Sequence, residues 1–455
     1  MISITTKTLQ DLEFQTVLTQ IEAYTTTELG KIAINQVCPF TNEDDLKKSL
    51  AQTNEYLASF ENENVVPSHY FESISEEIKR LSIDNYFLEI ESFRKIKTIA
   101  EASNNLIKFF ENFSEYYPKN HAESSQITYT KVIPEAINAV INRFGEIKDD
   151  ASMELGIIRR QLKSIQGRIN QSFVAALSHF NNLGFLDDIK ETVIDNRRVL
   201  AVTAMHRKKV KGSLLGNSKT GSIAYIEPQG TLQLTRELQE LQYKEREEVV
   251  KILKNLTAFI RDYQPLLEHY QTYLTLIDVI AAKANYAKEL NAILPEIVTK
   301  RELYIRDAFH PLLYLTNKTK GTKTFSQTIE LDINNRIIVI SGPNAGGKSI
   351  TLKTIGLLQV MLQSGILIPV HERSKMCLFD RILTDIGDNQ SIENHLSTYS
   401  YRLKNMNRFL KKCNDKTLFL IDEFGTGSDP ELGGALAESF LEVFYKREAF
   451  GVITT

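Results

Sequence analysis

The residue types with the clearest chemistry lie in one short segment in the last third of the chain. The segment consists of Gly342, Pro343, Asn344, Ala345, Gly346, Gly347, Lys348 and Ser349. It fits the phosphate-binding pattern G-x-x-x-x-G-K-S, and it follows an apolar run and precedes a helical pattern, as such a loop requires. The glycines let backbone N–H groups approach phosphate oxygens, Lys348 can reach the β and γ phosphates of ATP during catalysis, and Ser349 can coordinate Mg²⁺. The alternative is a glycine-rich turn between a strand and a helix.

A pair of adjacent acidic residues forms a second chemical feature. Asp422 and Glu423 directly follow the apolar run 418–421. Two carboxylates at the end of a buried strand are costly unless a cation lies nearby, and Mg²⁺ supplies that charge. We expect Asp422 to hold the metal through water, and Glu423 to act as the catalytic base that orients and deprotonates the attacking water. A solvated acidic loop after a core strand is the alternative.

Between these two motifs, Leu396, Ser397 and Thr398 open a helical stretch. Their backbone N–H groups and a hydroxyl could face a γ-phosphate. A plain helix N-cap explains the same residues equally well.

The surrounding pattern predicts several domains, mainly α-helical, with a small β-containing clamp and an α/β domain with a largely parallel sheet. Apolar residues recur at steps of three and four over 155–180 and again over 234–263, which predicts two long helices. Strands and helices alternate after Pro295, which is typical of a parallel sheet. We therefore predict a helical core and lever at 1–148, an outgoing lever helix at 149–185, a clamp tip at 186–230, a returning lever helix at 231–294, and a P-loop ATPase domain at 295–455.

Basic residues are concentrated in the predicted clamp tip. Between residues 196 and 226 the chain has no Asp or Glu and seven cations, which are Arg197, Arg198, Arg207, Lys208, Lys209, Lys211 and Lys219. Such a cluster favours contacts with the phosphate backbone of DNA, without reading its sequence. A basic loop that keeps the tip solvated is the alternative.

Composition excludes some classes of protein. No run approaches the roughly 18 apolar residues of a membrane-spanning helix, and the N-terminus lacks the pattern of a secretory signal. We therefore expect a cytoplasmic protein with no membrane partner. The three cysteines are far apart in sequence, which argues against both a disulfide framework and a zinc site.

The sequence resembles the MutS family, whose ATPase domain belongs to the ABC-type ATPases. The resemblance is carried by the segments GPNAGGKS, LIDEFGTGSDP, LSTYS and FHPLL, and it covers nearly the whole chain. The wording of IGDNQSIENHLSTYS and GTGSDPELGGALAES is most similar to the second bacterial type, the recombination-suppressing paralogue. This resemblance implies an ATP-dependent clamp on mismatched or branched DNA that serves mismatch repair or the suppression of recombination.

The resemblance also implies roles for particular residues. Lys348, Ser349, Asp422 and Glu423 match the phosphate, metal and catalytic positions. Ser397 and Thr398 match the segment that completes the partner subunit's site, and Gly425 to Asp429 match a loop that crosses the dimer interface, so a homodimer is implied. Phe309, His310 and Pro311 match a stretch near the adenine, although an ordinary turn at the entry to a strand would look the same.

Two other classes of protein share some of these features. A chromosome-organising ATPase also joins coiled coils to an ABC-type head, but there the phosphate loop precedes the coil. A protein that uses nucleotide only as a switch on ribosomes, or on another nucleic-acid assembly, is the remaining alternative.

The final segment, 449–455, reads as a strand without a following crossover helix, which would leave one sheet face uncovered. The family continues past this point with a His that senses the γ-phosphate and with a helical dimerisation segment. We therefore expect a fragment of a longer protein, one that binds ATP weakly and dimerises poorly by itself.

Overall fold

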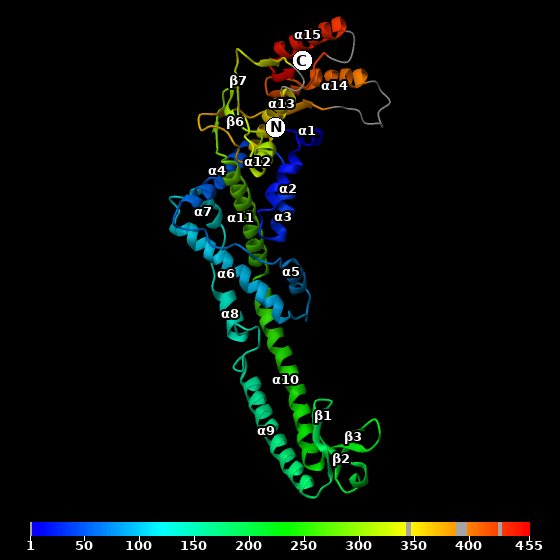
Figure 1. Ribbon diagram of the computed structural model, residues 1–455. Helices are drawn as coiled ribbons and strands as arrows, with labels where there is room; N and C mark the ends of the chain where they lie inside the picture. Colours follow the sequence, from blue (N-terminus) through cyan, green and yellow to red (C-terminus); the bar gives the residue numbers. More distant parts are fainter. Residues whose placement is uncertain (1, 343–346, 388–397, 426–429) are drawn as a thin grey trace. The chain divides into compact units, whose positions relative to one another are not determined.

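The computed structural model describes residues 2–342, 347–387, 398–425 and 430–455 (Figure 1). The chain forms two compact units. The first consists of Met1–Ser73, Glu101–Tyr129 and Glu268–Thr455, and the second consists of Ile74–Ala100 and Thr130–Leu267. None of the described helices is both long and apolar enough to cross a membrane.

A parallel four-stranded sheet organises the C-terminal part of the first unit. Its strands run in the order β10 (Arg381–Asp385), β11 (Thr417–Ile421), β12 (Phe450–Thr454) and β8 (Ile337–Ile340). The helices that alternate with them are α13 (Lys348–Gln363), α14 (Thr398–Lys412) and α15 (Pro430–Lys446). Successive side chains of a strand point to opposite faces. Accordingly, Leu418 and Leu420 share a hydrophobic cluster with α13, whereas Phe419 and Ile421 share another with α14 and α15.

A second, smaller sheet lies in the same unit. Its order is β5 (Glu296–Ile297), β9 (Lys375–Met376), β6 (Leu303–Ala308) and β7 (Gln327–Leu331), with β6 antiparallel to both of its neighbours. Helix α12 (Pro311–Lys320) follows β6 and ends at Gly321, whose φ of 67° favours glycine.

The N-terminal helices bury their apolar faces in the same core as the parallel sheet. They are α1 (Thr6–Asp11), α2 (Phe14–Glu22), α3 (Glu28–Asn35) and α4 (Glu43–Ala58), which the short η1 (Ser59–Glu61) follows. Leu12 and Leu420 approach α13 so closely at Gly356 that a Cβ there would lie 2.6 Å from each. The division of the chain into five segments stays a prediction, but apolar residues between positions 4 and 57 share one hydrophobic cluster with the sheet.

Three further helices complete the first unit. They are the C-terminal part of α6 (Ile90–Asn112), then α7 (Pro118–Ser124), and most of α11 (Gln264–Leu290).

The second unit is built on two long helices, α9 (Met153–Asn182) and α10 (Gln229–Arg261). Ion pairs join Arg159 to Glu245 at 2.8 Å and Arg168 to Glu237 at 3.8 Å. Because the partner of the later residue in α9 comes earlier in α10, the two helices are antiparallel, as Figure 1 shows. The unit also contains α5 (Ser75–Leu81), the start of α6 and α8 (Val132–Val140). Two long helices over these stretches agree with the sequence pattern.

A small antiparallel sheet connects α9 to α10. Its strands run in the order β1 (Leu186–Ile194), β2 (Arg197–Thr203), β4 (Ile223–Pro228) and β3 (Gly212–Asn217), with the single turn η2 (Ala204–His206) after β2. Leu200, Val202 and Ile226 pack in one cluster with Phe173 of α9. The mixed, mainly helical fold with small sheets therefore agrees with the sequence analysis.

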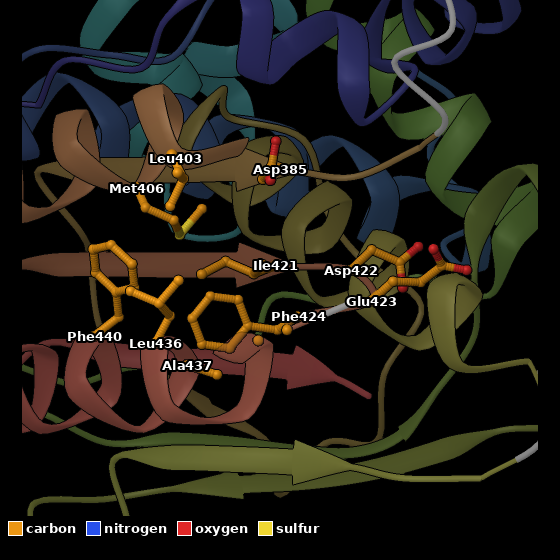
Figure 2. Close-up of a pocket in the computed structure, with 12 residues that line it drawn as sticks. Asp385, Leu403, Met406, Ile421, Asp422, Glu423, Phe424, Leu436, Ala437 and Phe440 are labelled. Carbon is orange, nitrogen blue, oxygen red and sulfur yellow. The ribbon is translucent and has the colours of Figure 1, made fainter. Parts of the chain in front are cut away.

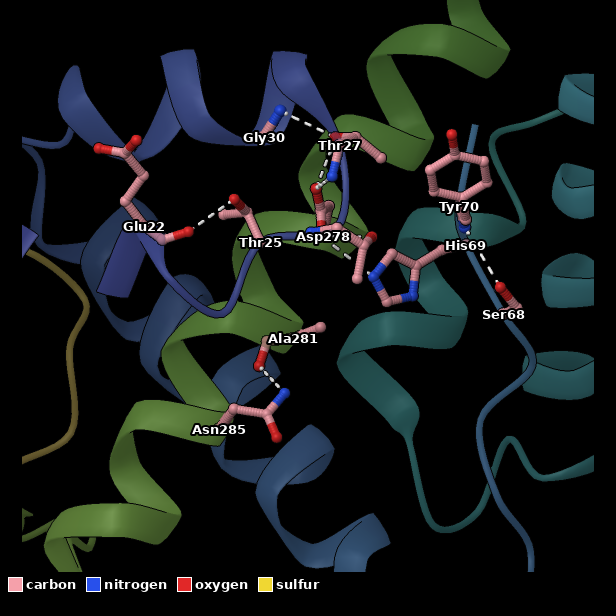
Figure 3. Close-up of polar contacts among 11 residues, drawn as sticks. Glu22, Thr25, Thr27, Gly30, Ser68, His69, Tyr70, Asp278, Ala281 and Asn285 are labelled. Carbon is pink, nitrogen blue, oxygen red and sulfur yellow. Dashed lines mark hydrogen bonds and ion pairs between the residues drawn. The ribbon is translucent and has the colours of Figure 1, made fainter. Parts of the chain in front are cut away.

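A buried carboxylate, Asp278 of α11, holds three separate segments of the first unit together (Figure 3). Its side chain is fully buried, and it accepts hydrogen bonds from the backbone N–H groups of Thr26 at 2.9 Å and Thr27 at 3.0 Å. Both threonine hydroxyls also donate to it, and Nε2 of His69 lies 3.1 Å from its Oδ1. Burial alone would raise the pKa of Asp278, but the hydrogen bonds outweigh burial and lower it.

Replacing Asp278 by asparagine should destabilise this unit. An amide cannot accept hydrogen bonds on both of its terminal atoms, so Asp278→Asn leaves buried donors unpaired and should lower the free energy of unfolding by about 3–5 kcal/mol. The folded pKa of Asp278 is below its unfolded value. The carboxylate therefore stabilises the fold above the unfolded pKa, and this stabilisation is lost as the pH falls through the folded pKa.

Urea unfolding at several pH values measures both effects. The difference between the wild type and Asp278→Asn should shrink as the pH falls below the ordinary carboxyl pKa of 3.8. The exposed Asp415 provides a matched control, since Asp415→Asn should leave the unfolding midpoint nearly unchanged. A difference that does not vary with pH would contradict the assignment.

Candidate functional site

The candidate phosphate loop leaves the parallel sheet at its carboxyl edge. Strand β8 ends at Ile340, and α13 begins at Lys348. Gly342 has a φ of 154° and Gly347 a φ of 79°, conformations that glycine adopts at low cost. Pro343, Asn344, Ala345 and Gly346 lie outside the described residues. The two glycines therefore occupy positions where the backbone itself selects for glycine.

Lys348 and Ser349 open α13 with different exposures. The side chain of Lys348 is buried, and its Nζ donates to the carbonyl oxygens of Gly342 and, at 2.7 Å, Thr455. Ser349 is exposed. The ammonium group therefore lies between the loop and the end of β12.

The acidic pair stands at the end of the neighbouring buried strand β11. Figure 2 shows the carboxyl groups of Asp422 and Glu423 side by side, directed away from the apolar side chains of Met406, Leu436 and Phe440. Glu423 has a φ of 50°, which is unusual for a residue with a side chain. Seven other described non-glycine residues, Glu13 and Glu448 among them, also have a positive φ, so this angle by itself assigns no function to Glu423.

Strand pairing brings the loop and the acidic pair to one edge. β12 lies between β11 and β8, and all three strands run parallel. Their carboxyl ends therefore meet at the same side of the sheet, which is where open α/β sheets bind ligands. At this edge the Lys348 ammonium donates to the carbonyl oxygen of Thr455. The hydroxyl of the preceding residue, Thr454, donates to the carboxylate of Asp422.

Two residues of this edge were missed by sequence reasoning. Thr454 is fully buried, and its hydroxyl contacts Asp422 and the backbone of Glu423. Asp385 at the end of β10 accepts a hydrogen bond from Asn405 at 3.0 Å, and its carbonyl accepts the N–H of Asp422 at 2.9 Å. The only available signal was position, since both residues lie near the carboxyl end of an apolar run.

Phe309 and His310 connect β6 to α12. His310 caps α12, although its Nδ1 is 3.5 Å from the N–H of Leu313, and its ring is buried. Burial lowers the pKa of His310 to about 4, so the ring is neutral at pH 7. The ring of Phe309 packs 5.2 Å from that of Tyr314. A role beside the adenine stays a prediction for both residues.

The predicted residues of the partner-facing segments are mostly outside the described structure. Thr398 is the first residue of α14, and its side chain lies outside the described part of the structure. Ser397 and Asp429 lie outside the described residues.

Within the second unit, the basic cluster divides into two groups. Arg197 pairs with the buried carboxylate of Glu227 at 3.2 Å, and Arg198 pairs with Glu191 at 2.6 Å. The guanidinium carbon of Arg198 also lies 4.3 Å from the centre of the Phe173 ring. These two arginines are part of the packing of the small sheet.

The other five basic residues are exposed. They are Arg207, Lys208, Lys209, Lys211 and Lys219. None of them has a carboxylate partner among the residues that the structure describes. The ammonium of Lys209 lies 5.3 Å from the centre of the Phe185 ring. An exposed group of cations without neutralising acids attracts polyanions.

Comparison with known proteins shows that the chain is similar in sequence to members of one family. Residues 338–455 match the family model described as MutS domain V. Over 99% of its length the chain is 34% identical to the Endonuclease MutS2 of Ligilactobacillus salivarius, of which it covers 56%. Over 99% of its length it is also 34% identical to the Endonuclease MutS2 of Finegoldia magna, of which it covers 57%. It is 32% identical to the Endonuclease MutS2 of Aquifex aeolicus, again over 99% of its own length, and covers 58% of that protein. The chain thus spans a little over half the length of these curated relatives.

The two groups of basic residues should respond differently to mutation. Arg197→Ala removes the cation beside the buried Glu227 and leaves that carboxylate with the hydroxyl of Thr235, which donates to it at 2.7 Å. We expect the free energy of unfolding to fall by about 1–3 kcal/mol. The control Lys208→Ala removes an exposed cation and should change the free energy of unfolding by less than about 0.5 kcal/mol. Urea unfolding compares the two variants, and equal losses would contradict the division.

Proposed function

Because the chain belongs to the MutS family, we propose that it is an ATP-dependent DNA-binding clamp, an Mg²⁺-dependent ATPase of the P-loop, ABC type. In this proposal, ATP binding and hydrolysis are coupled to the binding of mismatched or branched DNA, in mismatch repair or in suppression of recombination. The observation that carries the proposal is the carboxyl edge of the parallel sheet, where a G-x-x-x-x-G-K-S loop and the Asp422–Glu423 pair lie one strand apart.

The residues at this edge fit a magnesium–nucleotide complex. The positive φ angles of Gly342 and Gly347 allow backbone N–H groups to face phosphate oxygens, and the N-terminus of α13 adds the positive end of its dipole. Lys348 would contact the β and γ phosphates, and Ser349 with Asp422 would hold Mg²⁺. The metal would neutralise phosphate charge when bound.

Glu423 is the residue that we assign to proton transfer. Its carboxylate lies beside that of Asp422, beyond the end of β11, and both residues line the pocket with their carboxyl groups directed away from its apolar side chains (Figure 2). A carboxylate in this place can orient a water molecule and accept its proton as the water attacks the γ-phosphate.

The proposal includes a homodimer with composite sites. In this arrangement, Ser397, Thr398 and Asp429 would act on the nucleotide of the partner subunit, while Phe309 and His310 would lie near the adenine. The family relationship supports these roles.

DNA is the partner that we assign to the exposed basic residues of the small sheet. Phosphate contacts from Arg207, Lys208, Lys209, Lys211 and Lys219 would give affinity without sequence information. The same cations would also attract RNA, so a nucleotide-switched protein that acts on ribosomes is the second candidate. Competition between branched DNA and ribosomal particles distinguishes the two.

Glu423→Gln in the complete protein should keep ATP binding and lower hydrolysis by about 100-fold or more, the usual contribution of a general base. Steady-state turnover and equilibrium ATP binding measure the two properties separately. The exposed Glu372 supplies the control, since Glu372→Gln should behave as the wild type. Undiminished turnover in Glu423→Gln would remove the assignment.

Neutralising Lys208, Lys209 and Lys211 together, each to glutamine, should weaken DNA binding equally across sequences. The slope of log affinity against log salt concentration should flatten by about 2–3, because each phosphate contact contributes about 0.9.

A matched triple variant changes Lys163, Lys244 and Lys254, which are exposed on α9 and α10. It removes the same charge and should keep the original slope. If both triple variants lose the same slope, the effect is one of net charge and not of this surface.

A further inference from the structure

We propose that Thr454 is a positioning residue that fixes the Asp422–Glu423 pair for metal binding and water activation, an inference that rests on the proposed function. Thr454 is the last residue of β12, beside the end of β11. It touches neither the phosphates nor the attacking water in this proposal. It acts through the two residues that do.

A single buried residue bonds to three consecutive residues after β11. The Thr454 hydroxyl donates to Oδ1 of Asp422 at 2.5 Å and accepts the N–H of Glu423 at 2.8 Å. The Thr454 carbonyl accepts the N–H of Phe424 at 2.7 Å. Thr454 has no solvent exposure, so water does not compete for these bonds.

The contact to Asp422 orients a metal ligand. Because Oδ1 accepts the threonine hydroxyl, the carboxylate is held in one orientation and its Oδ2 is the oxygen left for the metal side. Groups that bond to a metal ligand in this way fix its orientation, and their loss typically lowers metal affinity by about 10–100-fold. The backbone N–H of Asp422 bonds to Asp385 at 2.9 Å, so the residue is held at both its backbone and its side chain.

The contact to Glu423 holds a strained backbone. The φ of 50° at Glu423 is costly for a residue with a Cβ, and it persists only where surrounding contacts determine it. The bond from the Glu423 N–H to the Thr454 hydroxyl, followed by that from the Phe424 N–H to the Thr454 carbonyl, supplies such contacts. The direction in which the Glu423 side chain leaves the backbone therefore depends on Thr454.

Thr454 differs from the two residues before it in β12 because its side chain carries a hydroxyl group. Val452 and Ile453 of β12 are buried and apolar, whereas Thr454 brings one donor and one acceptor into the same environment. Both are used, in opposite directions, by the two residues of the acidic pair. Serine can reproduce this pairing, but valine, which has the same shape as threonine, cannot.

The test compares Thr454→Val with Thr454→Ser in the complete protein. Each is combined with Glu423→Gln, which prevents turnover, and Mn²⁺ binding in the presence of ATP is followed by electron paramagnetic resonance. We expect Thr454→Val to weaken Mn²⁺ binding about tenfold or more, and Thr454→Ser to bind it as the parent does. With Glu423 intact, Thr454→Val should lower kcat at least tenfold with little change in the KM for ATP.

Thr417→Val is the matched control for stability. Thr417 is a fully buried threonine at the other end of β11, where its hydroxyl donates to Asn414 at 2.8 Å. Its replacement should lower the urea midpoint but leave Mn²⁺ affinity unchanged. Wild-type Mn²⁺ affinity and kcat in Thr454→Val, or an equal loss of Mn²⁺ affinity in Thr417→Val, would overturn the proposal.

These outcomes separate the two levels of inference. A wild-type protein that neither binds nor hydrolyses ATP would overturn the proposed function and this inference together. Hydrolysis that depends on Glu423 but is unaffected by Thr454→Val would overturn only the role of Thr454.

Discussion

Burial of β11 on both faces is the constraint on which the rest of the first unit depends. All of its residues, Thr417–Ile421, are buried, with α13 on one face and α14 and α15 on the other. A strand enclosed in this way can place polar groups only where it ends. Asp422 and Glu423 stand at that end, and the hydrogen bonds of Thr454 and Asp385 converge on them. The chemistry of the edge is thus a consequence of the packing behind it.

The N-terminal helices are part of this packing. The hydroxyl of Thr8 donates to the carbonyl of Ile382 at 2.9 Å, and the hydroxyl of Thr384 donates to Asp11 at 2.6 Å. Burial raises the pKa of Asp11 in spite of that bond. Lys353 of α13 pairs with Glu13 at 3.0 Å. Residues at the start of the chain therefore hold both β10 and the helix that carries Lys348.

Sequence reasoning succeeded where a structural requirement is local. Gly342 and Gly347 of the loop have backbone angles that glycine adopts easily, and the steps of three and four over α9 and α10 follow from the geometry of a helix. It failed where the requirement comes from residues distant in the chain. Thr454 and Asp385 matter because of strand order, which no local pattern encodes. Likewise, the acids that engage Arg197 and Arg198 become neighbours only when β1, β2 and β4 pair.

The close approach at Gly356 means that a side chain in the middle of α13 would require its neighbours to shift. Leu12 and Leu420 enclose that position from two parts of the chain, and both are fully buried, so neither can move aside freely. A methyl group there would displace either those leucine methyl groups or α13, whose first turn begins with Lys348. In a deep mutational scan, Gly356 would therefore be sensitive to substitution although the atoms nearest to an added Cβ belong to leucine side chains. Such a score would reflect the packing around α13 and not a chemical role of Gly356.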